Sequence, residues 1–344
     1  MGSVNTKNAE PAVRRRREGM ETPRAKVSPF QKRMPPSARR MVFIRQSSLF
    51  KQREAPVNPA LTEIEDKATI TEEIKNMVTD MGANTVGIAE YNRNIRFSDS
   101  EELKLTNVIV FAMTMAYDYM VDIGPNSQAE VHRVYHALDE IGVRVSQQIG
   151  AYGYHTRTEP NIADFPLPAY AWLAGLGELG KHGSLISPEL GSSFRLGAIA
   201  TDMPLIVDGP KDYGIDEVCN NCQICARFCP GDAIKHEKKT VNGIERWHVD
   251  TPACEPYFFR MHGCKICLSV CPYNAKSIFK DKFKSMAKDI RKAGDAKGMM
   301  KLISERTGID YEAIEYNPED EGRANVKINQ PVPDKKPKEM KNKC

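Results

Sequence analysis

The sequence lacks an apolar run long enough to cross a membrane. Its longest apolar stretch, residues 108–116, is interrupted only by Thr114 and has about half the length that a spanning helix needs. The composition also excludes a collagen, a coiled coil and a wholly disordered chain, because 41% of the 344 residues are hydrophobic and 27% are charged. We therefore expect a folded protein of two or three domains with no transmembrane segment.

The sequence has little net charge, +4, but the charge is unevenly distributed. Residues 1–54 hold fourteen Lys or Arg side chains against four Glu, and no amphipathic period persists there. We expect a basic, disordered arm over residues 1–56, which either solubilises the protein or docks to an anionic surface such as a membrane. Arg39 and Arg40 resemble part of a twin-arginine export signal, but polar residues follow them. We therefore expect a cytoplasmic location, with peripheral membrane association through the arm as an option.

Helical and strand patterns alternate between residues 57 and 210 and predict an α/β (α+β) core. Apolar residues at helical spacing predict two longer helices and one short helix, and short apolar runs predict strands. The helices are expected at 64–81, 127–152 and 169–176, and the strands at 85–89, 108–115, 154–158 and 194–201. A cysteine domain over 211–275 should follow, then C-terminal helices over 276–316 and a disordered Lys- and Pro-rich tail over 317–344.

Cysteine is concentrated in one segment. Eight of the nine cysteines lie between residues 219 and 271, whereas a disulfide scaffold would spread them across the fold. Their short spacing, with a proline after the last cysteine of each run, is typical of a ferredoxin with two [4Fe-4S] clusters. A pair of zinc sites is the alternative, and it fits this spacing less well. We interpret Cys344 as an unligated thiol.

In such ferredoxins the fourth cysteine of each run binds the cluster of the other run. The second run has a widened first gap, residues 255–263, which we interpret as a loop insertion. The predicted ligands of the first cluster are Cys219, Cys222, Cys225 and Cys271, and those of the second are Cys254, Cys264, Cys267 and Cys229. Because a ferredoxin needs no preceding core, we expect the clusters to deliver electrons to a site in residues 57–210.

A glycine-rich segment over residues 174–191 is the best candidate for that site. Five glycines in eighteen residues could let the backbone approach a large flat or anionic ligand. The phosphate-binding pattern GxxxxGK[ST] is absent from it. Candidate ligand-contacting residues of the segment are Gly177, Gly180, Lys181, His182, Gly183 and Ser184.

Three sequence features together resemble a known family. The segments AGLGELGKHGSLISPELG (174–191) and FRLGAIATDMPL (194–205), followed by the cysteine runs, resemble the corrinoid and iron–sulfur reductive dehalogenases. NVIVFAMTMAYDYM (107–120) extends the resemblance upstream. The epoxyqueuosine reductases share much of the pattern, but Glu178 stands where they usually have an aromatic residue.

The resemblance implies a nitroreductase-like corrinoid-binding core followed by the two-cluster ferredoxin-like domain. It implies a base-off cobalamin-type corrinoid, and no DxHxxG sequence for a lower histidine ligand is present. By position, Tyr135 would be the proton donor, Arg195 the nearby cation and Asn161 the asparagine between them. A cation favours the phenolate of a tyrosine and burial opposes it, so the pair could pass a proton. Tyr135 also lies on an apolar stripe, where a packed core tyrosine is ordinary, and asparagine after proline is common in turns.

The predicted function is a corrinoid-dependent reductase, a reductive dehalogenase that acts on a small organohalide. A reduced ferredoxin or a flavodoxin-type protein would donate its electrons. One alternative is an epoxyqueuosine-reductase-like enzyme that acts on tRNA, with Asp164 as its nearest candidate acid, although we expect no nucleic-acid partner. The other alternative is a non-catalytic iron–sulfur electron carrier.

Overall fold

The computed structural model describes residues 27–97, 100, 102–161 and 163–321. The predictions for residues 1–26 and 322–344, including the thiol of Cys344, therefore lie outside the described residues. No helix in the described ranges is both long and apolar enough to cross a membrane.

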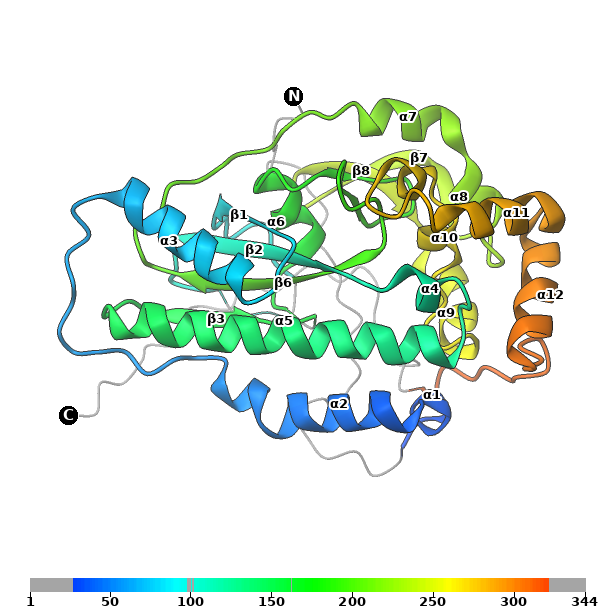
Figure 1. The fold of residues 1–344 in the computed structure, drawn as a ribbon, viewed down its shortest axis with the longest axis horizontal. Helices are drawn as coiled ribbons and strands as arrows, with labels where there is room; N and C mark the ends of the chain where they lie inside the picture. The colour runs from blue at the N-terminus through cyan, green and yellow to red at the C-terminus, as the bar shows by residue number, and fades with distance from the viewer. Residues whose placement is uncertain (1–26, 98–99, 101, 162, 322–344) are drawn as a thin grey trace.

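A four-stranded antiparallel sheet forms the centre of the core (Figure 1), in the order β1-β2-β6-β3. Its strands are β1 (Thr85–Glu90), β2 (Asn107–Thr114), β6 (Phe194–Thr201) and β3 (Thr156–Glu159). All four strands were predicted from the sequence. Strand β2 is apolar along its length because both faces of the sheet are covered: Ile109 and Phe111 face one core cluster, and Val108 and Val110 face the other.

Helices cover the sheet on both faces. Helices α3 (Lys67–Asp80) and α5 (Pro125–Ala151) pack on one face, and α6 (Leu167–Leu173) packs on the other. Gly142 lets α5 lie close to β3, because a Cβ atom there would be 2.5 Å from the Cγ2 of Thr158. The N-terminal end of α5 points towards the cysteine domain (Figure 1), so this helix connects the core to the predicted clusters.

The second half of the predicted basic arm is helical, so the expectation of disorder is wrong for this stretch. It forms α1 (Pro29–Arg33), α2 (Pro36–Ser47) and the 3₁₀ helix η1 (Leu49–Gln52). Helix α2 lies along the outer side of α5 (Figure 1). It is anchored by two buried residues, Ala38 and Arg45, rather than by an apolar stripe. This is why the sequence showed no amphipathic period.

The cysteine domain combines short helices with one hairpin. Its elements are α7 (Ile215–Cys222), α8 (Ile224–Arg227), β7 (Ile234–Val241), β8 (Ile244–Val249), α9 (Thr251–Arg260), α10 (Ile266–Ser269) and the 3₁₀ helix η2 (Pro272–Lys276). The widened gap of the second cysteine run lies largely within α9. The prediction of a loop there was wrong, because Asp250 caps the helix through the backbone N–H of Ala253 and Pro252 occupies its first turn.

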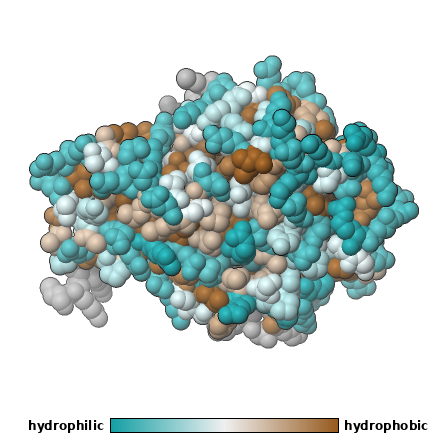
Figure 2. Space-filling view, viewed as in Figure 1, coloured by the Kyte–Doolittle hydropathy of each residue, from teal (hydrophilic) through white to brown (hydrophobic). Residues whose placement is uncertain are grey.

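The predicted C-terminal helices are present as α11 (Phe283–Ala293) and α12 (Ala296–Thr307). They pack with α4 (Tyr117–Met120), which links them to the core. The described beginning of the predicted tail is ordered, because the buried Glu321 accepts a hydrogen bond of 2.8 Å from the backbone N–H of Phe30. Hydrophilic residues dominate the region of α11 and α12 on the face shown in Figure 2, where apolar residues form separate patches.

Candidate functional site

The glycine-rich segment forms a tight hairpin of β4 (Glu178–Leu179) and β5 (Leu185–Ile186). A Cβ atom on Gly177 would lie 2.1 Å from the carbonyl oxygen of Ile186, and one on Gly183 would lie 2.8 Å from the side chain of Val249. Gly180 also faces Ile186. These glycines therefore allow the chain to pack closely on itself. Their contacts lend no support to the prediction that they approach a corrinoid.

Two side chains of this hairpin reach the first cysteine run. Lys181 is 2% exposed, its Nζ donates to the carbonyl oxygen of Asn220 at 3.3 Å, and it lies 4.1 Å above the ring of Trp247. His182 is 7% exposed and lines a small pocket with a volume of about 30 Å³. The hairpin therefore contacts the site predicted for the first cluster.

Four thiols drawn from both cysteine runs line that pocket. They are Cys219, Cys222 and Cys225 from the first run and Cys271 from the second, which we call the first cysteine group. This is the crosswise set that the spacing predicts. Burial raises the pKa of both Cys225 and Cys271 to about 12 in the metal-free protein. The thiols are therefore neutral until a bound metal displaces their protons.

The remaining four cysteines of the two runs form the second cysteine group: Cys229, Cys254, Cys264 and Cys267. Cys267 is close enough to the other three to interact with them electrostatically, and also to Cys225 of the first group. The two groups are therefore neighbours. Among the described residues, no three His, Cys, Asp or Glu side chains converge closely enough to hold a single metal ion. The eight cysteines of the two groups are all free.

Tyr135 lies between two arginine side chains that come from different parts of the chain. The guanidinium carbon of Arg195, on β6, is 5.5 Å from the centre of its ring. The guanidinium carbon of Arg45, on α2, is 5.0 Å from the same centre. The structure thus brings together the predicted tyrosine and cation. Both positive groups lie within cation–π distance of the tyrosine ring.

Arg45 also joins the third predicted residue to this site, and sequence reasoning missed it. Its Nε donates to the carboxylate of Asp139 at 2.6 Å, and one terminal nitrogen donates to the Oδ1 of Asn161 at 2.5 Å. Asn161 is exposed, and its hydrogen bond with Arg45 links it to the side chain that lies over the Tyr135 ring. Because Arg45 falls in the segment expected to be disordered, only its burial in the folded chain identifies it.

The helix that carries Tyr135 also interacts with residues next to cysteines of the second run. His132, one turn earlier on α5, interacts electrostatically with Lys265, which lies between two cysteines of that group. Burial, with the positive charges of Arg45, Arg195 and Lys265, lowers the pKa of His132 to about 3, so its imidazole is neutral. Gln128, a further turn towards the N-terminus, hydrogen-bonds the ring of His262 at 2.7 Å.

Comparisons with known proteins support the predicted double-cluster domain and the resemblance to reductive dehalogenases. A family model of the 4Fe-4S dicluster domain matches residues 218–275. A tetrachloroethene reductive dehalogenase from Desulfitobacterium hafniense is 29% identical over 217 residues, which cover 59% of this chain and 39% of that protein. The chain resembles the reductive dehalogenases. It spans about two fifths of the length of that curated relative.

Two further comparisons define the limits of this resemblance. A solved reductive dehalogenase, whose structure suggests a mechanism for B12-dependent dehalogenation, superposes with a TM-score of 0.64 at 24% identity. The match covers 81% of this chain and 43% of that chain, and it confirms the predicted fold. An epoxyqueuosine reductase from Lactococcus garvieae is 31% identical over 151 residues, which cover 42% of this chain and 41% of the enzyme.

The reductive-dehalogenase fold implies a corrinoid, and buried polar atoms near Tyr135 fit a ligand with many amide groups. Within the described part of the chain, the Nε of Arg195 and the Nδ1 of His132 are buried without a hydrogen-bond partner. The Oγ of Ser193 and the Nε2 of Gln128 are also buried without a hydrogen-bond partner among the described residues. Because buried polar groups are normally hydrogen-bonded, these four atoms are free to hydrogen-bond a polar ligand.

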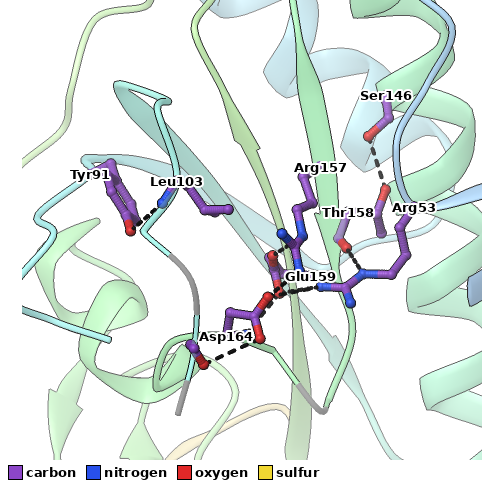
Figure 3. Close-up of polar contacts among 9 residues, drawn as sticks. Arg53, Tyr91, Leu103, Ser146, Arg157, Thr158, Glu159 and Asp164 are labelled. Carbon is purple, nitrogen blue, oxygen red and sulfur yellow. Dashed lines mark hydrogen bonds and ion pairs between the residues drawn. The ribbon is translucent and has the colours of Figure 1, made fainter. Parts of the chain in front are cut away.

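The carboxylate of Asp164 is held in an ionic cluster in this reductive-dehalogenase-like core (Figure 3). It forms an ion pair with Arg157 and another with Arg53 at 3.6 Å, and it accepts a hydrogen bond from Ser100 at 3.3 Å. Glu159 belongs to the same cluster, and burial raises its pKa to about 7 against the opposing effect of Arg53. Through Arg53, the residue after η1, the cluster connects the N-terminal helical segment to β3.

Proposed function

We propose that the protein is a corrinoid-dependent reductive dehalogenase that replaces a halogen atom of a small organohalide with hydrogen. The reaction consumes two electrons and one proton and releases one halide ion for each carbon–halogen bond that is broken. The observation that best supports this proposal is the position of Tyr135 beside Arg45 and Arg195, on a helix whose His132 interacts electrostatically with Lys265 of the second cysteine run. This arrangement combines a proton donor with a path for electrons.

A bound corrinoid would supply the redox-active cobalt at which the carbon–halogen bond is cleaved. The two cysteine groups would hold the [4Fe-4S] clusters that carry electrons towards it. A reduced ferredoxin or a flavodoxin-type protein in the cytoplasm is the proposed electron donor. Arg195 Nε and His132 Nδ1 would hydrogen-bond polar groups of the cofactor or substrate, because both atoms are buried and lack partners within the described chain.

Tyr135 would deliver the proton that the carbon atom gains. Its hydroxyl loses that proton in the reaction, and the positive charges of Arg45 and Arg195 would stabilise the resulting phenolate. Asp139 and Asn161 would hold Arg45 in place through its Nε and a terminal nitrogen. His132 stays neutral at working pH, because its pKa is about 3, and so adds no further positive charge.

The experiment that tests the proposal measures halide release. Protein reconstituted anaerobically with iron, sulfide and a corrinoid should release chloride or bromide from members of a panel of halogenated aliphatic and aromatic compounds when a low-potential reductant is supplied. Reductant and corrinoid without protein serve as the blank. A protein that holds its clusters and corrinoid but releases no halide above this blank from any member of the panel would contradict the proposal.

The epoxyqueuosine-reductase alternative has one finding in its favour, the 31% identity over 151 residues. The ionic cluster around Asp164 counts against it, because that carboxylate is already held by Arg157 and Arg53. Binding of tRNA that persists at moderate salt would support this alternative, and loss of binding on deletion of residues 1–26 would assign the contact to the basic arm.

A further inference from the structure

The imidazole of His182 has one nitrogen whose role the fold leaves open. The side chain is 7% exposed and lines the pocket that the first cysteine group surrounds. Its Nε2 is buried and has no hydrogen-bond partner in the described part of the chain. A buried polar atom of this kind calls for a partner, and the pocket that His182 lines is the site predicted for a cluster.

The other ring nitrogen decides which atom carries the proton. The backbone N–H of Ser184 donates to the Nδ1 of His182 at 3.1 Å. An Nδ1 that accepts a hydrogen bond carries no hydrogen, so the ring proton must be on Nε2. His182 therefore has a free N–H donor rather than a free acceptor.

A second donor comes from the residue before it. The backbone N–H of Lys181 donates to the thiol sulfur of Cys219, one of the four cysteines of the first group. The tight hairpin that carries both residues depends on Gly180, where a Cβ atom would lie only 2.6 Å from Ile186. The hairpin thus holds consecutive residues against the same cysteine group.

We propose that the Nε2–H group of His182 donates a hydrogen bond to a sulfur atom of the cluster bound by the first cysteine group. The inference rests on the ligand assignment of that cluster and goes beyond the dehalogenation reaction. Reduction adds negative charge to the cluster and its sulfur atoms, so a hydrogen bond to sulfur stabilises the reduced state more than the oxidised state. His182 therefore raises the reduction potential of this cluster and makes it easier to reduce.

The test is a redox titration of the anaerobically reconstituted protein, monitored by electron paramagnetic resonance. His182→Phe keeps a planar ring but removes the donor, and it should shift the midpoint potential of one cluster to a more negative value with the iron content unchanged. His182→Gln, which retains an N–H donor, should recover part of this shift. His155→Phe is the matched control, because His155 is exposed and pairs with Asp202, and it should leave both potentials unchanged.

A second readout detects the hydrogen bond itself. In protein labelled with ¹⁵N-histidine, hyperfine spectroscopy of the reduced first cluster should show a coupled histidine nitrogen that is absent from His182→Phe. Unchanged potentials in His182→Phe with both clusters intact would overturn the proposal. If that variant loses its cluster, absence of the ¹⁵N-histidine coupling in the wild-type protein would overturn the proposal instead. Wild-type protein without a first cluster would contradict the ligand assignment itself.

Discussion

Tyr135→Phe is expected to lower the rate of halide release by at least about 100-fold, the scale on which a positioned proton donor acts. The substitution removes the phenolic hydroxyl and keeps the ring between Arg45 and Arg195, where it packs against both guanidinium groups. Iron and corrinoid contents should stay at their wild-type values, because none of the predicted ligands changes. The measurement is halide release per corrinoid under a low-potential reductant.

A second tyrosine, just past the C-terminal end of the same helix, gives the matched control. Tyr152 follows the last residue of α5, at the opposite end from the cysteine domain (Figure 1), and Tyr152→Phe should leave the rate unchanged. Unaltered halide release in Tyr135→Phe would show that the proton comes from another group or from water. Equal losses in both variants would show that the effect arises from the stability of α5 rather than from the hydroxyl.

Cys271→Ser is expected to remove the cluster of the first cysteine run, although Cys271 belongs to the second run. Its side chain lines the same pocket as Cys219, Cys222 and Cys225. Loss of one of four thiolate ligands should leave about half of the iron and one of the two cluster signals. Halide release should fall to the blank if that cluster lies on the electron path.

Cys229→Ser is the reciprocal variant. Cys229 ends the first run but lies close to Cys254 and Cys264 of the second. It should therefore disturb the other cluster, and the two variants should retain different signals in electron paramagnetic resonance. If each variant instead lost the cluster of its own run, the crosswise assignment would be contradicted.

The regular elements of the core were predictable because local periodicity determines them. The helical spacing of residues 64–81 and 127–152 corresponds to α3 and α5, and the uniformly apolar run after residue 107 corresponds to β2. The spacing of the cysteines predicted which thiols would share a pocket, because a cubane cluster imposes its own geometry on its ligands. The family resemblance supplied Tyr135 and Arg195 by their positions in matching segments.

The sequence could not reveal contacts that depend on the fold. Arg45 precedes Tyr135 by ninety residues, and its segment is held by a buried ion pair with Asp139 that leaves no apolar pattern. The glycine-rich segment was interpreted as a cradle because glycine permits close approach to any neighbour. Only the structure shows that the neighbours of Gly177 and Gly183 are Ile186 and Val249.

The most direct test of the account is the metal and corrinoid content of protein that has been reconstituted anaerobically with iron, sulfide and cobalamin and then freed of unbound cofactor. We predict about eight irons and one corrinoid per chain, as two [4Fe-4S] clusters and one electron-accepting cofactor require. Zinc in place of iron, or a full set of clusters without any retained corrinoid, would contradict the proposal of a corrinoid-dependent reductase. Clusters without a corrinoid would indicate that the protein is an electron carrier and not a dehalogenase.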